Sequence, residues 1–331
     1  MCIRDRDLGI VPYAVLVAYL LVLLGLGWLG YLRSRASEED YYLAGRQQGW
    51  IVTALTIMAT FFSSFALLGA PGMVYREGVV FALVSLNVPV AGFCVYVFGK
   101  RIWQIGRARS YVTPADMICE YYGSAVILRL LIVLVGALFT IPYVMMQLKA
   151  GGELAAVLFD GVENSFEIGA VVLAALTAAY IMIGGMRSVA WTDVLQCILL
   201  VAGMLLAGTA MVSSFGGWNS FSSAVANLPE RSLTVPGNTG FWQTPMLFTI
   251  CVLMPIGGIV QPAQWMRFYS ANDARTLRRS ALVFVVVLTG CFLFGIMLVG
   301  LGGQVLYPLD FTGAKIAPNA SVGSYAQILV V

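Results

Sequence analysis

The chain has 331 residues, of which 60% are hydrophobic and 11% are charged, and its mean hydropathy is +0.88. Soluble globular domains carry about 25% charged residues, so the composition excludes that class and indicates a polytopic membrane protein. The net charge of +3 then concerns orientation in the bilayer rather than nucleic-acid binding. The six cysteines are scattered and the chain has no histidine, so neither a metal framework nor a disulfide scaffold is expected.

Apolar runs of about 20 residues, enough to cross the hydrocarbon core, recur along the chain. Residues 1–7 form a charged preface that looks like an appended, non-native sequence, and they are set aside. Eight membrane spans are predicted, at 8–32, 50–75, 79–99, 125–159, 168–183, 190–212, 244–266 and 280–303. Polar loops are predicted at 33–48, 100–124, 213–242 and 267–279, and the apolar run from Tyr325 indicates that the chain ends as a ninth span begins.

The second predicted span contains residues that a simple membrane anchor does not need: Ser63, Ser64, Gly69, Pro71 and Gly72. Proline lacks a backbone donor and glycine lowers helix stability, so carbonyls at 59–64 are free to leave the helix and face a buried ion. Irregular backbone at this depth persists only beside protein or a water-filled cavity. The alternative is a continuous helix with a proline kink.

Cations are distributed unevenly between alternate loops. One set holds twelve: Arg33, Arg35, Arg46, Lys100, Arg101, Arg107, Arg109, Arg187, Arg267, Arg275, Arg278 and Arg279. The other set holds four: Arg76, Lys149, Arg231 and Lys315. Because Lys and Arg concentrate on the cytoplasmic side, the N-terminus is predicted to lie outside.

A second informative stretch is GGMRSVAWTDVLQ at 184–196, where two glycines end one span and Trp-Thr-Asp opens the next. This string resembles the signature of the sodium:solute symporter family. The resemblance extends to YYLAGR at 41–46, GAPGMVY at 69–75, YVTPADMICEYYG at 111–123 and QWMRFYSAND at 264–273. It implies an all-α, inverted-repeat, five-plus-five transporter core within a single transmembrane domain at 1–331. Residues 8–32 would be an extra N-terminal helix, 50–212 the first repeat and 244–331 the start of an incomplete second repeat.

The resemblance also implies site residues. The carbonyls of Ala59 and Phe62 would bind sodium, a hard cation that prefers oxygen ligands. Asp193 would handle the ion near its cytoplasmic exit, and its alternative role is a helix N-cap. No catalytic residue and no metal other than sodium is expected.

The expected solute pocket has few polar groups. Ser63, Ser64, Ala66, Gln147, Met254 and Gln261 are its predicted binding residues. Phe61 stands where the proline-transporting branch of the family has an aspartate, and Ala66 and Met254 stand where the sugar branch has amides. A sugar's hydroxyls would each need a buried partner, so a small monocarboxylate or amino acid fits better.

We therefore predict a secondary active transporter that couples inward sodium flow to solute uptake in the plasma (inner) membrane. Its partners would be the solute, sodium and the lipid bilayer, without nucleic acid and without a cofactor beyond the coupling ion. An enzyme is not expected, because the spans lack clustered acidic residues. The alternative is a transporter-like sensory module of a signalling protein.

The cation asymmetry makes a topology prediction. A reporter domain fused after Arg109 should score cytoplasmic, and one fused after Arg231 should score external, because these positions follow cation-rich and cation-poor segments respectively. Alkaline phosphatase and fluorescent-protein fusions measure both positions. The reverse pattern would refute this topology.

Overall fold

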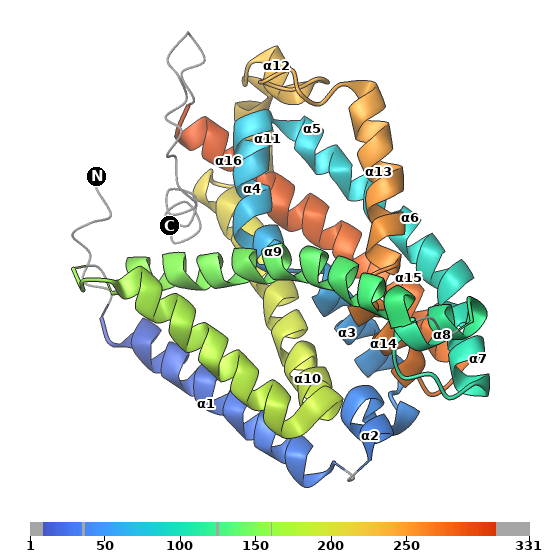
Figure 1. The fold of residues 1–331 in the computed structure, drawn as a ribbon. Coiled ribbons are helices and arrows are strands. Elements are labelled where there is room, and N and C mark those ends of the chain that lie inside the picture. The colour runs from blue at the N-terminus through green and yellow to red at the C-terminus, as the bar shows by residue number, and fades with distance from the viewer. Residues whose placement is uncertain (1–8, 35–36, 124–125, 160, 309–331) are drawn as a thin grey trace. The chain divides into compact units, whose positions relative to one another are not determined.

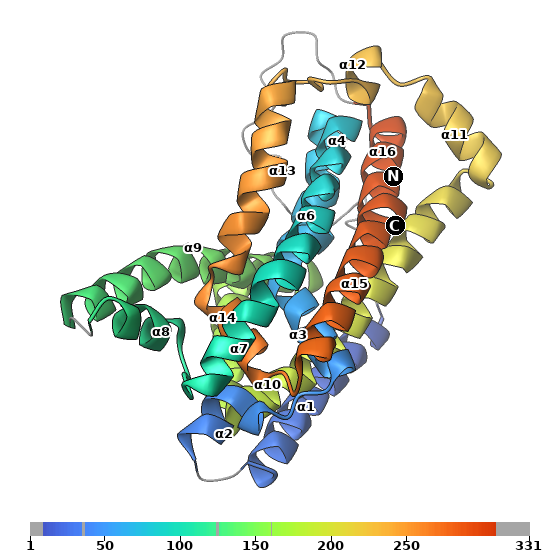
Figure 2. The same cartoon turned by 90° about the vertical axis from the view of Figure 1, so that its right-hand side faces the viewer.

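A computed structural model describes residues 9–34, 37–123, 126–159 and 161–308. The preface at 1–7 and the apolar run from Tyr325 lie outside these ranges. The described residues form helices and no strand, with one isolated bridge between Gln48 and Ala271. The predicted all-α fold is confirmed for this part of the chain, whose helices are labelled in Figures 1 and 2.

The chain forms two compact units, each assembled from three separate stretches. Unit 1 contains the described residues of Met1–Phe61, Phe93–Cys197 and Gly258–Val283. Unit 2 contains those of Phe62–Gly92, Ile198–Gly257 and Phe284–Val331.

The helices of unit 1 are α1 (Val11–Leu32), α2 (Glu38–Leu43), α3 (Trp50–Phe61), α7 (Lys100–Ala108), α8 (Pro114–Tyr121), α9 (Val126–Leu158) and α14 (Pro262–Ser270). Those of unit 2 are α4 (Ala70–Glu77), α5 (Val79–Ala82), α11 (Trp218–Ala226), α12 (Glu230–Leu233) and α16 (Met297–Leu306). Four helices have residues in both units: α6 (Asn87–Cys94), α10 (Ser165–Ser214), α13 (Thr244–Ile259) and α15 (Ala274–Cys291).

Among the described residues, 5 helices are long and apolar enough to cross a membrane alone, and two bent pairs raise the number to 7. One pair is α3 with Phe65–Glu77, and the other is α13 with α14. The 50-residue α10 counts once, although it is kinked at Gly185 and contains both predicted spans at 168–183 and 190–212. Each half has about the 20 residues that a span requires, so counting them separately gives the eight predicted spans.

The predicted interruption of the second span is confirmed, but it precedes the proline. Helix α3 ends at Phe61, and Phe62 and Ser63 are non-helical. The chain then resumes through a π-helical turn, Phe65–Gly69, in which the Phe65 carbonyl accepts the N–H of Ala70. Pro71 follows in the first turn of α4, where its missing donor costs little. The alternative of a continuous helix with a proline kink is therefore wrong.

The kink in α10 depends on one glycine. Gly185 has φ 56° and ψ −150°, and a Cβ at this position would lie 2.6 Å from the Tyr41 carbonyl oxygen. Helical structure continues directly after this residue instead of after a loop. Asp193 consequently lies inside the second half of α10, and its alternative role as an N-cap is wrong.

Several predicted loops contain short helices: α2, α7, α8, α11 and α12. Helix α8 starts with a capping box between Thr113 and Asp116, which pairs backbone donors that a loop would leave to water. Helix α15 starts at Ala274, inside the predicted loop at 267–279. There Asp273 accepts the Thr276 N–H at 2.6 Å, and this hydrogen bond is the main cause that lowers the pKa of Asp273.

In unit 2, α16 packs closely against α4. A Cβ at Gly300 would lie 2.5 Å from the Val74 Cβ and 2.7 Å from the Pro71 carbonyl oxygen. Gln304 donates its side-chain amide to the Tyr75 carbonyl at 2.6 Å. Small residues at such contacts let backbones approach, which is how helices gain packing energy in a bilayer.

Gly185→Ala should destabilise the folded protein by about 1–3 kcal/mol or more, because alanine is strained at this φ and its Cβ collides with Tyr41. The matched control is Gly203→Ala in the same helix, where nothing lies within 4 Å of an added Cβ. Thermal unfolding of the purified full-length protein measures both. Equal melting temperatures for the two variants would contradict the role of Gly185.

Candidate functional site

The carboxyl end of α3 receives side-chain donors from two other helices of unit 1. The Tyr143 hydroxyl of α9 donates to the Thr60 carbonyl at 3.1 Å. The Gln264 amide of α14 donates to the Ile57 carbonyl at 3.5 Å. An α-helix leaves its last four carbonyls without intrahelical donors, here those of 58–61, so Tyr143 supplies a donor to one of them and Gln264 adds a contact one residue earlier.

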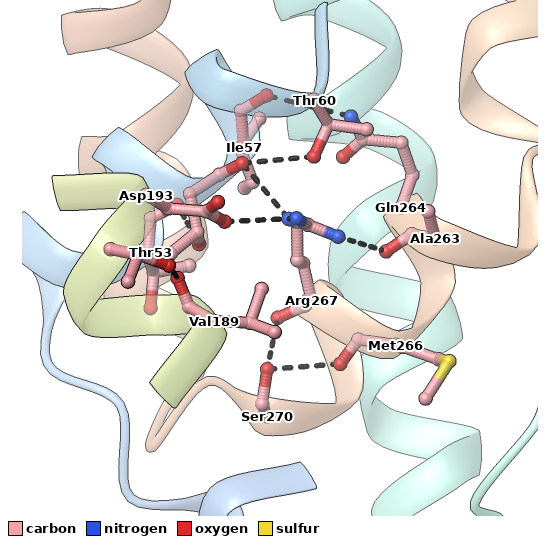
Figure 3. A network of polar contacts seen from close by, with 12 residues as sticks. Thr53, Ile57, Thr60, Val189, Asp193, Ala263, Gln264, Met266, Arg267 and Ser270 are labelled. Carbon is pink, nitrogen blue, oxygen red and sulfur yellow. Dashed lines mark hydrogen bonds and ion pairs between the residues drawn. The ribbon is translucent and has the colours of Figure 1, made fainter. Parts of the chain in front are cut away.

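Arg267 of α14 makes the central contact at this helix end (Figure 3). Its Nε donates to the Thr56 carbonyl at 2.9 Å, and its Nη2 donates to the Asp193 carboxylate at 2.9 Å. Its Nη1 donates to the Ala263 carbonyl at 3.1 Å within its own helix. One guanidinium thus joins α3, α10 and α14 within unit 1.

The arrangement balances charge where charge is costly. The side chains of Arg267 and Asp193 are 11% and 13% exposed, so each has lost most of its solvation. A helix carboxyl end carries a partial negative charge, which the guanidinium also offsets. Removing one member of a buried pair leaves the other without a counter-charge, which lowers the free energy of unfolding by about 3–5 kcal/mol.

The predicted sodium ligands lie at this break. Ala59 is in the last turn of α3, among the carbonyls with no further donor in that helix. Phe62 is the first non-helical residue and its side chain is buried. Neutral backbone oxygens of this kind fit sodium, a hard cation. Ala59 and Asp193 belong to unit 1 and Phe62 to unit 2.

The predicted solute residues fall into two groups. Ser63, Ser64, Ala66 and Met254 belong to unit 2, and Gln147 and Gln261 belong to unit 1. Ser63 accepts the Phe65 N–H at 3.2 Å, which helps the chain re-enter a helix. Met254 lies within reach of the Asn87 amide, at 3.9 Å from its sulfur.

The two glutamines contact their own helices. Gln147 donates to the Tyr143 carbonyl at 3.4 Å, one turn back along α9. Gln261 has an extended backbone at the start of α14, and its carbonyl accepts the N–H of Gln264 at 3.0 Å. Pro255, Gly257, Gly258 and Pro262 predict a break in the seventh span, and the structure has it here, between Ile259 and Pro262.

Sequence reasoning missed two residues of this site, Arg267 and Gln264. Arg267 was counted only as a loop cation, although it lies inside α14. The available signal was a helix-starting proline, Pro262, followed at helical spacing by a glutamine and an arginine. That spacing places both side chains near one face of a short helix.

Comparison with known proteins identifies similar chains. The model of the sodium:solute symporter family matches residues 41–331. The sodium/pantothenate symporter of Escherichia coli is 26% identical over 302 residues, covering 88% of this chain and 60% of that protein. The sodium/proline symporter of Escherichia coli is 26% identical over 283 residues, covering 82% of this chain and 55% of that protein. The chain thus spans about 60% of the length of the curated relatives it matches.

A solved structure has the same fold. It is a Na⁺-coupled sialic acid symporter in a substrate-bound, outward-open state, with a TM-score of 0.80 and 19% sequence identity. The similarity covers 98% of this chain and 66% of that one.

Arg267→Gln should destabilise the protein by about 3–5 kcal/mol, because it leaves the buried Asp193 carboxylate without its cation. Adding Asp193→Asn to this variant should recover much of the loss. Thermal unfolding in detergent measures the series, with Arg279→Gln at an exposed position of α15 as the control. The ion pair has no such role if Arg267→Gln unfolds at the same temperature as Arg279→Gln.

Proposed function

Because the chain belongs to the sodium:solute symporter family, we propose that its parent protein couples inward sodium flow to the uptake of a small organic solute. The observation that carries this proposal is the interruption of α3 at Phe62, which leaves backbone carbonyls at a helix end inside an apolar segment. Such backbone persists at membrane depth only where protein or a wet cavity meets it.

Sodium binds the carbonyls of Ala59 and Phe62 in this proposal. These ligands carry no formal charge, so the site remains neutral when the ion leaves. Asp193 takes part in the ion's exit and exchanges its contact with Arg267 for a transient contact with sodium. Sodium then compensates the carboxylate, which lies 2.9 Å from the guanidinium, while Arg267 keeps its contacts with the Thr56 and Ala263 carbonyls.

The solute is a small monocarboxylate or amino acid. Its contacts come from Ser63, Ser64, Ala66, Gln147, Met254 and Gln261, which provide uncharged donors among apolar groups. Pantothenate, proline and sialic acid, the solutes named for the relatives, each carry a carboxylate. A carboxylate meets the partial positive charge of a helix amino end, and α14 starts at the break of its span.

The chain is an integral protein of the plasma membrane. We assign its N-terminus to the outside and treat 1–331 as one transporter domain. The extra helix at 8–32 precedes a first repeat at 50–212 and the start of a second at 244–331. The two interrupted spans, α3 with Phe65–Glu77 and α13 with α14, each open one repeat, as expected for discontinuous helices around a central site.

Solute uptake by the full-length protein in membrane vesicles should collapse when sodium is replaced by choline at constant pH, because choline cannot enter a carbonyl cage. Radiolabelled carboxylates and amino acids serve as solutes, and vesicles lacking the protein serve as the control. Full uptake driven by a proton gradient alone would disprove sodium coupling.

Asp193→Asn should raise the sodium concentration for half-maximal uptake roughly tenfold while the protein still reaches the membrane, because asparagine keeps an oxygen for Arg267 but loses the charge. Sodium titrations of uptake at matched membrane abundance measure the effect. Asp273→Asn is the control, since asparagine still caps α15 outside the spans. If uptake by Asp193→Asn depends on sodium concentration as it does in the wild type, the proposed role of Asp193 in ion exit is refuted.

A further inference from the structure

Two charged residues that the proposed site does not use, one beside each of two sequence motifs, meet at the kink of α10. Asp40 lies immediately before the YYLAGR string and forms an ion pair with Arg187 of the GGMRSVAWTD string. Arg187 Nε lies 3.1 and 3.0 Å from the two carboxylate oxygens, and Nη2 lies 2.5 Å from Oδ1. This bidentate pair joins residues 147 positions apart in sequence.

The pair is buried. The Asp40 side chain is 2% exposed and that of Arg187 is 23% exposed. Bidentate geometry fixes direction as well as distance, which a lysine at this position could not do. Loss of this partner would leave the buried carboxylate with less compensation for its charge.

The backbone around the pair is tightly packed, so a shift of the ion pair would also shift α2 and the kink of α10. A Cβ at Gly45, whose φ is +64°, would lie 3.0 Å from Asp40 Oδ1 and 3.4 Å from Arg187 Nη2. A Cβ at Gly185 would lie 2.6 Å from the Tyr41 carbonyl. Helix α2 therefore lies directly against the kink, held there by the ion pair.

A second contact fixes the same point from α1. The Ser188 hydroxyl donates to the Gly27 carbonyl at 2.8 Å, and a Cβ at Gly30 would lie 2.2 Å from Ser188 Oγ. Arg187 and Ser188 thus hold the first turn of the second half of α10 to two neighbouring helices of unit 1.

The same half of α10 carries Asp193 further along. It follows Arg187 by six residues, about 9 Å along a rigid α-helix, and the helix between them is unbroken. A rotation or shift at Arg187 therefore displaces the Asp193 carboxylate relative to Arg267. The 2.9 Å contact between them tolerates little such movement before it is lost.

We propose that Asp40 and Arg187 are positioning residues for transport: their pair clamps α2 to the kink of α10 and sets the place of Asp193 against Arg267. The inference rests on the proposed ion role of Asp193. It gives the segment before the second span a function in the sodium step rather than in membrane insertion alone.

The test uses full-length protein carrying Asp40→Asn, Arg187→Gln, both changes together, or Arg187→Lys. Glu38→Gln is the matched control, an exposed carboxylate in the first turn of the same helix. Two quantities are measured at equal membrane abundance. One is the sodium dependence of uptake. The other is the rate at which N-ethylmaleimide labels Cys197, a buried thiol one turn beyond Asp193. Mass spectrometry of the peptide that contains Cys197 measures this rate.

Each single neutral variant should raise the half-saturating sodium concentration about fivefold or more, and the double variant should be no worse than either, because all three lose one shared interaction. Cys197 labelling should accelerate in the same variants. Arg187→Lys, which keeps the charge without the fork, should be intermediate and provides a variant that folds if the neutral ones do not.

Singles that match Glu38→Gln in both measurements, or a double variant whose effects multiply, would overturn the clamp. Faster labelling without any sodium-dependent uptake, in wild type or variants, would instead leave the clamp standing and refute the proposed transport function.

Discussion

The constraint on which this structure depends is that backbone carbonyls at membrane depth need partners. Helix α3 stops at Phe61, and three of the carbonyls in its last two turns receive donors from Tyr143, Gln264 and Arg267. In water these groups would be solvated at little cost, but in hydrocarbon each unpaired group costs several kcal/mol. Tyr143 of α9 thus pairs one of the carbonyls that the interruption exposes, and the side chains of α14 hold the preceding turn of α3 in place.

Charge is handled in the same way along the second half of α10. Arg187 at its start pairs with Asp40, and Asp193 two turns later pairs with Arg267. Each pair joins the helix to a different neighbour within unit 1. Because each pair combines one positive and one negative group, neither leaves a net charge in an apolar region. Paired charges of this kind are weak evidence for stability, and what they show here is which neighbour each part of the helix contacts.

Much of the fold follows from sequence patterns, and most of the site does not. Apolar runs located the spans, and Pro and Gly residues located the two interrupted ones. The first break lies at Phe62 and Ser63, inside the predicted stretch of 59–64, and Pro71 follows in the first turn of α4 without breaking the chain there. Asp193 was misread as a possible cap because a single residue, Gly185, makes the turn. The contact of Arg267 with Asp193 joins residues 74 positions apart, which no local pattern encodes.

The most direct test of the central claim is hydrogen–deuterium exchange of the peptide that covers 59–66 in the purified full-length protein. An ion held by the carbonyls at the break should order this segment, so its amides should exchange more slowly in sodium than in an equal concentration of choline. Peptides of α16 should exchange alike in both salts. Identical exchange of 59–66 with and without sodium would contradict the assignment of the break as an ion site.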